Sequence, residues 1–522
     1  LLLIITVLGV SSCYDDKGNY SYDPKNDIKI TFDASYFEAI LGEKIKLTPR
    51  LTFAIDSNDV DLSYKWTFLV KEISDQRNLE WVVDTVTSNH NVYLNVTDNR
   101  TGVTFSGGIS AMLSSAYAKE AWVVLAKQNG KSVLSYIRET QEDDGSEYGK
   151  FTYTDIPDIY QLVNGEELGT EPVRVLEHFA ARGGIGHFWV LQNGGQGCVD
   201  LSGEDFTKDI LLNDIFLDGN LPVDFKPIDM IDMKWLTCVV NHDGKVYTRK
   251  KLTNQLYNSG YFIDRPLEFE NEEVDGSRMV LAPFSDLNYT VMYDKVHNRF
   301  LAIADLKKET AGKVVKFTVD ESGYAPDFAR LDNLGNMEVL HTGYYEVKEG
   351  ESGDQGYYSI LRDRTTGNYY THDFRVNAMS ESSNPSAFPV LQRQIDLNQV
   401  INGTSKNVFN VLRSWVYGDD FGTPYVLISK DNELWLYDRD AKMPVEKYYE
   451  FPQGQIITAI DSESVGSRRV AIGMQSGEFY VLDLTRKAVN GQKEKLIYAS
   501  THNFGEIVHI RYKVCSGNGW GY

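Results

Sequence analysis

The chain has 522 residues, of which 42% are hydrophobic and 12% aromatic, with 42 glycines and 14 prolines. This length allows two or three domains with a substantial core, and the composition is typical of many short strands joined by tight turns. The formal net charge of −22 argues against nucleic acid as a partner, because the excess of acidic groups leaves little positive charge to neutralise phosphates.

The first ten residues form an apolar run as long as the h-region of a signal peptide and too short to span a bilayer. The chain does not begin with Met, so we expect the first residues of this signal to be missing. Ser11 and Ser12 precede Cys13 as small residues precede a lipoprotein cleavage site. We therefore predict a lipoprotein signal peptide at 1–12 and a lipid anchor on Cys13, to which each buried CH₂ contributes about 0.8 kcal/mol. The alternative is an ordinary secretory signal or a truncated helix.

The other three cysteines are Cys198, Cys238 and Cys515. They are widely spaced and contain no CxxC pair, so they indicate neither a disulfide framework nor a zinc site. A Cys198–Cys238 disulfide is possible, but the spacing favours buried free thiols.

Residues 13–27 are polar and rich in turn formers, which predicts a lipidated tether. Strand-like segments then follow at 28–32, 40–53, 62–70, 91–98 and 103–113. Period-2 alternation places Tyr64, Trp66 and Phe68 on one face of their strand, and likewise Val92, Leu94 and Val96. Strands at this spacing predict an immunoglobulin-type β-sandwich over residues 28–115. The Tyr64-Lys65-Trp66 run and the later YLNVTDNRTG (93–102) resemble the pattern of PKD-like domains.

Residues 116–522 contain a loose repeat of strand, polar turn and strand. Its copies lie at 122–137, 188–201, 236–249, 300–317, 357–374, 425–438 and 470–484. Glycine-containing turns join most of the pairs, as tight hairpins require. One hairpin cannot bury both faces, so the copies must stack, which predicts a β-propeller. Seven blades fit the repeat best, six or eight stay open, and residues 506–514 would complete a blade begun after residue 120. An irregular set of sandwiches is the alternative.

No catalytic signature is present: the chain has no HExxH, GxSxG, Walker or GxGxxG motif in the required context. The closest histidine pairs, His178 with His187 and His502 with His509, lack metal-ligand spacing and favour structural roles. The DSNDVD stretch (56–61) lacks the glycine and distal glutamate of an EF-hand, which favours a solvated turn. We assign no catalytic residue, metal or cofactor.

The YGDDFG stretch (417–422) is the candidate ligand-binding loop. Asp419 and Asp420 are adjacent there, and adjacent side chains usually point apart, which disfavours paired acid–base chemistry. Trp415 and Tyr417 could stack on a sugar or a peptide. Packing in the core or at the rim is the alternative. The same two interpretations apply to the tyrosine pairs at 344–345, 357–358 and 369–370.

The lipobox VSSC (10–13), the following CYDDKGNYSY, the PKD-like pattern and EAWVVLAKQNGKSVLSYI (120–137) together resemble PKD-like lipoproteins of Bacteroidetes. In such proteins acidic residues after the lipidated cysteine form a surface-export signal, and Asp15 and Asp16 fill those positions. The resemblance implies an anchor in the outer membrane, facing the cell exterior. It also implies an accessory role beside a SusC/SusD-type, TonB-dependent transporter of glycans or peptides.

We therefore expect an all-β, non-enzymatic surface lipoprotein. The anchor would hold it, the sandwich would act as spacer or docking module, and the propeller would bind a ligand or partner proteins. Two alternatives stay open, because propellers also host enzymes. One is a hydrolase acting on surface glycans or peptides, which would need carboxylates, or a carboxylate with a histidine, converging at the central channel. The other is a purely structural subunit of the transporter complex.

Overall fold

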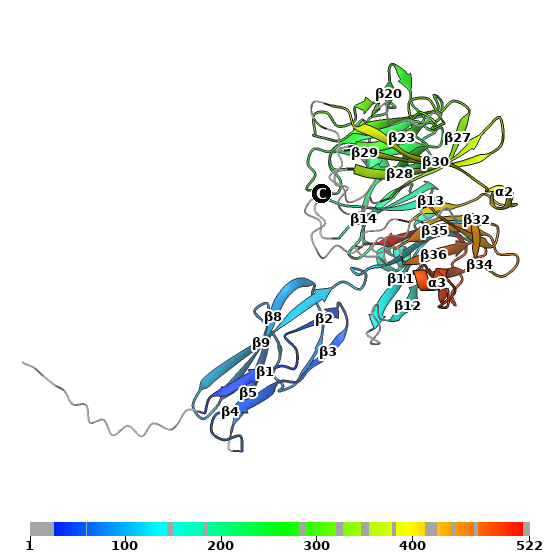
Figure 1. Cartoon of the computed structure of the whole chain (residues 1–522). Helices are drawn as coiled ribbons and strands as arrows, with labels where there is room; N and C mark the ends of the chain where they lie inside the picture. Colours follow the sequence, from blue (N-terminus) through cyan, green and yellow to red (C-terminus); the bar gives the residue numbers. More distant parts are fainter. Residues whose placement is uncertain are drawn as a thin grey trace, which may run out of the picture. The chain divides into compact units, whose positions relative to one another are not determined.

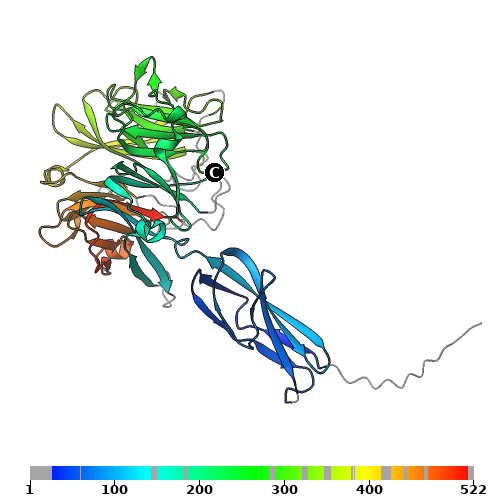
Figure 2. The ribbon, with the colours of Figure 1, turned by 180° about the vertical axis from the view of Figure 1, so that it is seen from behind.

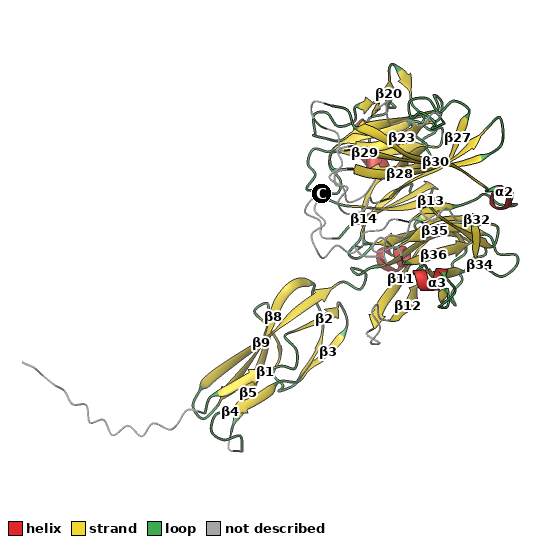
Figure 3. Cartoon of the chain, in the orientation of Figure 1, coloured by secondary structure: helices red, strands yellow, loops and turns green. Residues whose placement is uncertain are grey.

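The computed structural model describes residues 26–58, 60–142, 150–180, 185–280, 289–319, 327–345, 354–377, 380, 383–412, 425–439, 444–463 and 468–514. The chain divides into two compact units, Leu1–Ser115 and Ala116–Tyr522. The described parts of both units are built mainly from β-strands (Figures 1 and 3). Helices in these parts are short, and none is long and apolar enough to cross a bilayer.

The N-terminal unit is a β-sandwich. Its larger sheet has the order β2-β9-β8-β5-β6, with β2 parallel to β9 and the other pairs antiparallel. The strands of this sheet are β2 (Tyr36–Ile40), β5 (Leu62–Phe68), β6 (Lys71–Ser74), β8 (Thr87–Asp98) and β9 (Val103–Ser114). The second layer consists of two antiparallel pairs, β1 (Ile28–Thr31) with β4 (Arg50–Phe53) and β3 (Lys44–Leu47) with β7 (Leu79–Val82).

The core of this unit contains the residues that the alternation predicted. Trp66, Val92, Leu94 and Val96 are completely buried, and Phe68 is 3% exposed. The indole of Trp66 donates a hydrogen bond to the carbonyl of Gln76 (2.9 Å), which satisfies its polar atom inside the core.

The sequence favours a strand pair or one bulged strand over 40–53, and the structure has neither. Strands β3 and β4 do not pair with each other, because β3 pairs with β7 and β4 with β1. Pro49 lies between them and has no N–H to donate to a continuous ladder, so the chain changes partner there. The sequence pattern identified the strands but not their partners.

The second unit consists of successive groups of antiparallel strands that resemble propeller blades (Figures 1 and 2). The first group comprises β39 (Glu506–Lys513), β10 (Ala121–Gln128), β11 (Lys131–Glu142) and β12 (Lys150–Ile156). The second comprises β13 (Gly169–His178), β14 (His187–Gly194), β15 (Val199–Ser202) and β16 (Lys208–Leu211). Strand β39 pairs with β10 over most of its length, so the prediction that 506–514 completes the first group is confirmed.

The following groups continue in chain order. The third group comprises β17 (Pro227–Asp232), β18 (Leu236–Asn241) and β19 (Val246–Lys250). The fourth comprises β22 (Arg278–Val280), β23 (Tyr289–Asp294), β24 (Arg299–Ala304) and β25 (Val314–Val315). The fifth comprises β27 (Met337–Tyr345), β28 (Asp354–Asp363), β29 (Tyr369–Asn377) and β30 (Ser386–Ile395), with β26 (Thr318–Val319) parallel to β30. The last two are β31 (Phe409–Val411), β32 (Tyr425–Lys430), β33 (Glu433–Asp438) and β34 (Glu446–Glu450), and β35 (Ile457–Ser462), β36 (Arg469–Met474), β37 (Phe479–Asp483) and β38 (Leu496–Ala499).

Short helices, turns and one small hairpin lie between or beside these strands. They are α1 (Ile159–Asn164), α2 (Asn398–Ile401), α3 (Arg486–Val489), the 3₁₀ turns η1 (Leu212–Ile215) and η2 (Leu217–Gly219), and a small hairpin of β20 (Glu268–Phe269) and β21 (Glu272–Glu273). Beside β19, the N–H of Leu267 donates to the carbonyl of Val246 (2.7 Å), so an irregular segment continues that sheet.

The predicted hairpins coincide with the two central strands of their groups, with one exception. The copy at 300–317 covers β24 and β25, whereas the central hairpin of that group is β23–β24. Its turn, KVHN (295–298), contains no glycine, and Asn298 takes the positive φ of 50° instead. Asparagine tolerates this conformation, so a search for glycine turns placed the repeat one strand too late.

The apolar cores lie between neighbouring groups. One cluster joins β10 and β11 to β13, β14 and β15, and later clusters join each group to the next. The last cluster packs Trp122 of β10 and Tyr512 of β39 against Phe479 of β37. The series of interfaces therefore returns to its starting point, as radial packing of sheets requires.

A buried charge cluster fastens this last interface. Arg469 on β36 forms an ion pair with Glu139 on β11 (2.8 Å), and its Nε donates to Glu463 (2.7 Å). The indole of Trp122 and the hydroxyl of Tyr512 donate to the two oxygens of Glu139 (2.8 and 3.2 Å). These bonds join the beginning and the end of the unit.

Two of the cysteines lie in the described residues. Cys198 and Cys238 are free and buried, which confirms the preference for free thiols at these positions. Burial raises the pKa of the Cys198 thiol to about 12, so it stays protonated. Cys515 lies outside the described residues.

Candidate functional site

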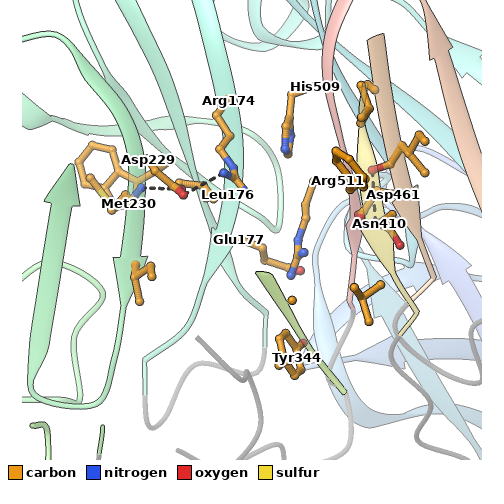
Figure 4. A pocket seen from close by; sticks show the side chains of 18 of the residues that line it. Arg174, Leu176, Glu177, Asp229, Met230, Tyr344, Asn410, Asp461, His509 and Arg511 are labelled. Carbon is orange, nitrogen blue, oxygen red and sulfur yellow. Dashed lines mark hydrogen bonds and ion pairs between the residues drawn. The ribbon is translucent and has the colours of Figure 1, made fainter. Parts of the chain in front are cut away.

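The second unit contains a cavity of about 410 Å³ that we consider the candidate functional site (Figure 4). Its lining comes mainly from β13, β17, β27, β31, β35 and β39. Each of these strands is at the same edge of its group, and β39 has this position in the first group. The inner strands of a ring of sheets face its centre, so residues distant in sequence share one cavity.

Basic side chains lie on two neighbouring strands of the cavity wall. Arg174 on β13 forms an ion pair with Asp229 on β17 (2.9 Å), and Figure 4 shows it near His509 of β39. Arg511 lies on β39, two residues beyond His509. The Nε atoms of Arg174 and Arg511 are buried and make no hydrogen bond to a described residue. Each retains a donor that a bound molecule or water could use.

Other polar atoms of the wall are also unpartnered within the described structure. They are Nε2 of His341, Nδ1 of His509 and Oδ1 of Asn410. His341 stacks on Phe409, with ring centroids 5.2 Å apart. Burial lowers the pKa of His341 to about 3 and that of His509 well below its usual value. Both rings are therefore neutral at pH 7, and each offers one donor and one acceptor.

The cavity wall also contains carboxylates. Burial raises the pKa of Glu177 to about 7, although the charges of Arg511 and Lys513 oppose the shift. The N–H of Val514 donates to Glu177 (3.0 Å), and the N–H of Tyr512 donates to Asp461 (2.8 Å). Glu177 therefore lies near its midpoint of ionisation at neutral pH, although it contacts a donor as Asp461 does.

A histidine cluster adjoins the cavity. His178 ends β13, His187 begins β14, and the two are cross-strand partners. Asp200 on β15 lies between them, 2.8 Å from His178 and 3.0 Å from His187. Burial works against protonation of His178, but Asp200 and Asp232 outweigh it and raise its pKa to about 9. Among the described residues these three side chains form the group whose ligand atoms lie close enough to hold a metal ion.

The residues predicted from sequence are placed only in part. Trp415, Tyr417, Asp419 and Asp420 lie outside the described residues, as do Cys13, Asp15 and Asp16. The tyrosine pairs belong to the core, where Tyr345, Tyr357, Tyr358 and Tyr369 are at most 9% exposed, while Tyr344 borders the cavity. In the 56–61 turn, Asp56 accepts the N–H of Asn58 (2.9 Å), an ordinary turn contact.

Sequence reasoning missed both the cavity lining and the histidine cluster. The repeat highlighted the middle strands of each group, whereas the cavity is lined by inner strands. A signal for the histidines was available, since antiparallel partners have a constant sum of residue numbers. Val175 pairs with Val190, and the same sum pairs His178 with His187. A spacing of nine residues across a hairpin can thus bring two histidines together.

A comparison with family models matches residues 13–172 to the PKD-like family, which is less than half of the chain. The chain contains a PKD-like region. This region reaches past Ser115 into the first strands of the second unit. No curated protein matches the chain.

Solved structures resemble the chain at low identity. A quinonprotein alcohol dehydrogenase-like protein from Bacteroides thetaiotaomicron is 12% identical, with a TM-score of 0.38, and the match covers 92% of this chain and 99% of that one. AztD from Citrobacter koseri is 13% identical (TM-score 0.33; 86% and 97% covered), and BamB from Moraxella catarrhalis 10% identical (TM-score 0.30; 66% and 81% covered). Likenesses at these values say nothing about ligands or activity.

Proposed function

We propose that this protein is a surface lipoprotein of the outer membrane that binds a small polar ligand in its central cavity. It would serve as an accessory subunit of a SusC/SusD-type uptake complex and capture a glycan or peptide for the transporter. The observation that supports binding is the cavity of about 410 Å³ with unpartnered polar atoms on several of its walls.

The chemistry of the wall suits sugars and short peptides. Buried polar groups without partners cost free energy, roughly 1–3 kcal/mol each, unless water or a ligand satisfies them. His341, Asn410 and Arg511 together offer donors and acceptors, and hydroxyl or amide groups can bond to both kinds. The volume lies in the range of small-molecule sites, roughly 300–1,000 Å³.

We further propose that the second unit closes as a seven-bladed propeller. Seven groups give this number, and they begin with β39, β13, β17, β22, β27, β31 and β35. An apolar cluster packs each group against the next. The pairing of β39 with β10 supports closure of the ring by strands from both ends of the unit.

Ligand binding is testable by calorimetry with a panel of glycans and peptides and the protein lacking residues 1–13. The Asn410→Ala variant should weaken binding of the ligand found, because it removes one acceptor and one donor from the wall. Asn336→Ala is the matched control, because Asn336 is exposed and donates to Thr365 (3.2 Å) away from the cavity. A panel that gives no heat would contradict ligand binding and favour the structural role.

Anchoring and partnership need separate experiments in cells. Cys13→Ala should release the protein from the membrane fraction, and protease added to intact cells should digest the wild-type protein if it faces outward. Replacing Asp15 and Asp16 by alanine should then protect it. A tagged protein should co-purify with the neighbouring transporter, and recovery of the protein alone would contradict the partnership.

One observation favours a hydrolase as the second candidate. Glu177, His178 and Asp232 all border the cavity, which is the convergence that a hydrolase requires. Glu177, with a pKa of about 7, could supply a proton at neutral pH. The same panel, assayed for new reducing ends or amines, tests this candidate. Activity that Glu177→Gln abolishes would establish it, and an inactive wild-type protein would remove it.

A further inference from the structure

The cluster of His178, His187 and Asp200 has the composition and spacing of a metal site. The two histidines extend from adjacent strands β13 and β14, which Figure 1 shows side by side, and Asp200 comes from the next strand, β15. One ligand atom from each residue lies within 4.8 Å of the other two. Metal–nitrogen and metal–oxygen bonds of about 2.0–2.2 Å separate neighbouring ligand atoms by a little over 3 Å, so small rotations of the side chains suffice.

The three residues are already held in place. Asp200 is completely buried and accepts a hydrogen bond from the amide of Asn258. The ring of Tyr257 stacks on His187, with centroids 3.6 Å apart. Metal-binding histidines usually direct their second ring nitrogen to a carboxylate. His178 approaches this arrangement, since its Nε2 faces the proposed ligand Asp200 and its second nitrogen, Nδ1, lies 3.7 Å from the carboxylate of Asp232.

The charges around the cluster leave room for a cation. Asp200, Asp209 and Asp232 lie within 4 Å of the two histidines. Lys251 lies 2.6 Å from Asp232 and Arg249 lies 3.9 Å from it, while the charge of Arg249 also acts on Asp200 at longer range. The end of the cluster formed by His187, Asp200 and Asp209 has no lysine or arginine ion pair among the described residues.

An entry path also exists. The side chain of His187 is 15% exposed and that of Asp209 is 46% exposed, whereas His178 and Asp200 are buried. A hydrated ion can therefore meet Asp209 and His187 first and exchange its water for the inner ligands. Asp209 or a water molecule would complete the coordination.

We propose that His178, His187 and Asp200 form a binding site for a divalent transition-metal ion. Two imidazoles and one carboxylate favour Zn²⁺, Co²⁺, Ni²⁺ or Fe²⁺ over Ca²⁺ and Mg²⁺, which prefer oxygen ligands. Three protein ligands leave a position for water or another molecule. This inference is independent of the proposed function, because the site needs neither a glycan nor a transporter. The rival interpretation is a metal-free ion-pair network that joins β13 and β15 to β17.

The test uses the whole chain, without a histidine tag and after treatment with a chelator. Calorimetry with Zn²⁺ should show one site, and Co²⁺ should develop the visible absorption of a bound ion. His187→Gln should weaken binding about 100-fold or more, since even outer-shell changes cost about 10–100-fold. Because His187 is the more exposed of the two histidines, this variant is expected to fold.

His242→Gln is the matched control. His242 also contacts an aspartate, Asp224 (2.9 Å), but is exposed and belongs to no group of three possible metal ligands among the described residues. Its loss should leave the Zn²⁺ affinity unchanged. Zn²⁺ should also raise the melting temperature of the wild-type protein and of His242→Gln but not of His187→Gln, because only bound ions stabilise the folded state. Failure of the wild-type protein to bind either ion, or equal binding by His187→Gln, would overturn the proposal.

Discussion

The two units of the chain differ in how deeply they bury ion pairs. In the sandwich, ion pairs such as Lys44–Glu80 (2.6 Å) and Lys65–Glu72 (2.8 Å) join side chains that are half exposed or more. In the second unit, Arg469 and Glu139 form a pair whose side chains are 9% and 4% exposed. Lys251 and Asp232 are equally hidden, at 2% and 7%.

This difference bears on stability and on function. Exposed pairs contribute little, about 0–1 kcal/mol, because water and salt screen them. Buried charges are costly to desolvate and tolerable only as complete sets. The second unit concentrates such sets at the seam between its first and last groups and around its cavity. Among the described residues of the sandwich the buried charge is that of Asp98, and its partner Arg100 is 44% exposed.

The largest effect that would test this contrast comes from removing β39. Truncation after Gly505 deletes one of the two strands that pair with β10, one wall of the cavity and the buried Ile507, Ile510 and Tyr512. We expect the second unit to lose protection from hydrogen–deuterium exchange throughout, while the sandwich keeps its protection. Truncation after Val514, which leaves β39 in place, is the control. Local fraying confined to β10 in the shorter chain would show that the ring does not depend on closure.

A smaller but still large effect is expected from Arg469→Met. The change leaves Glu139 and Glu463 buried without their cation, and breaking a buried pair in this way costs about 3–5 kcal/mol. Chemical denaturation, followed by exchange in peptides of β11 and β36, measures the loss. The variant that also carries Glu139→Gln and Glu463→Gln should recover part of it, because the unpaired charges are gone. A loss below about 1 kcal/mol would place this cluster with the exposed pairs of the sandwich.

The sequence predicted those features of each unit that local patterns encode. Alternation identified Trp66 and Leu94 as core, and glycine turns located most central hairpins. Strand partners were less accessible, as the separation of β3 from β4 at Pro49 shows. The KVHN turn was missed because Asn298 replaced the expected glycine.

The site was harder to predict than the fold for a physical reason. Arg174, His341 and Arg511 come together only when the inner strands converge, and no local pattern records that convergence. Burial, which makes His341 neutral, is likewise a property of the folded unit. The one local signal was the constant sum of residue numbers across the β13–β14 hairpin, which pairs His178 with His187. The residues chosen from sequence for binding, Trp415, Tyr417, Asp419 and Asp420, fall outside the described structure and remain a prediction.

A moderate effect is expected from mild acid, again in the second unit. Burial lowers the pKa of His341 to about 3 and of His372 to about 4, against an ordinary value of 6.5. The folded state thus binds fewer protons than the unfolded chain below pH 6.5. The stability due to these neutral rings is complete above pH 6.5 and is lost as pH falls towards 4.

Each unit of pKa corresponds to about 1.4 kcal/mol, so these two rings contribute a loss of a few kcal/mol between pH 6.5 and 4, which the raised pKa of Glu177 and Asp305, about 7 each, opposes. His372→Gln keeps a donor for the carbonyl of Ala329 (2.9 Å) but cannot titrate, and its stability should fall less steeply over this range. Denaturation at several pH values, resolved by exchange into the two units, measures both slopes. Equal slopes for the wild-type protein and the variant would show that His372 does not contribute.

The smallest expected effect lies on the sandwich surface. Hydrogen bonds from Lys44 and Lys46 lower the pKa of Glu80 to about 2, a direction that would by itself predict loss of stability as acid protonates this carboxylate. All three side chains are at least half exposed, however, so water and salt weaken the attraction. We therefore expect Glu80→Gln to leave the unfolding of the sandwich unchanged at physiological salt, and Lys65→Met, at the other exposed pair, to behave alike. A destabilisation comparable to that of Arg469→Met would break the contrast between the units, because surface pairs would then matter as much as buried ones.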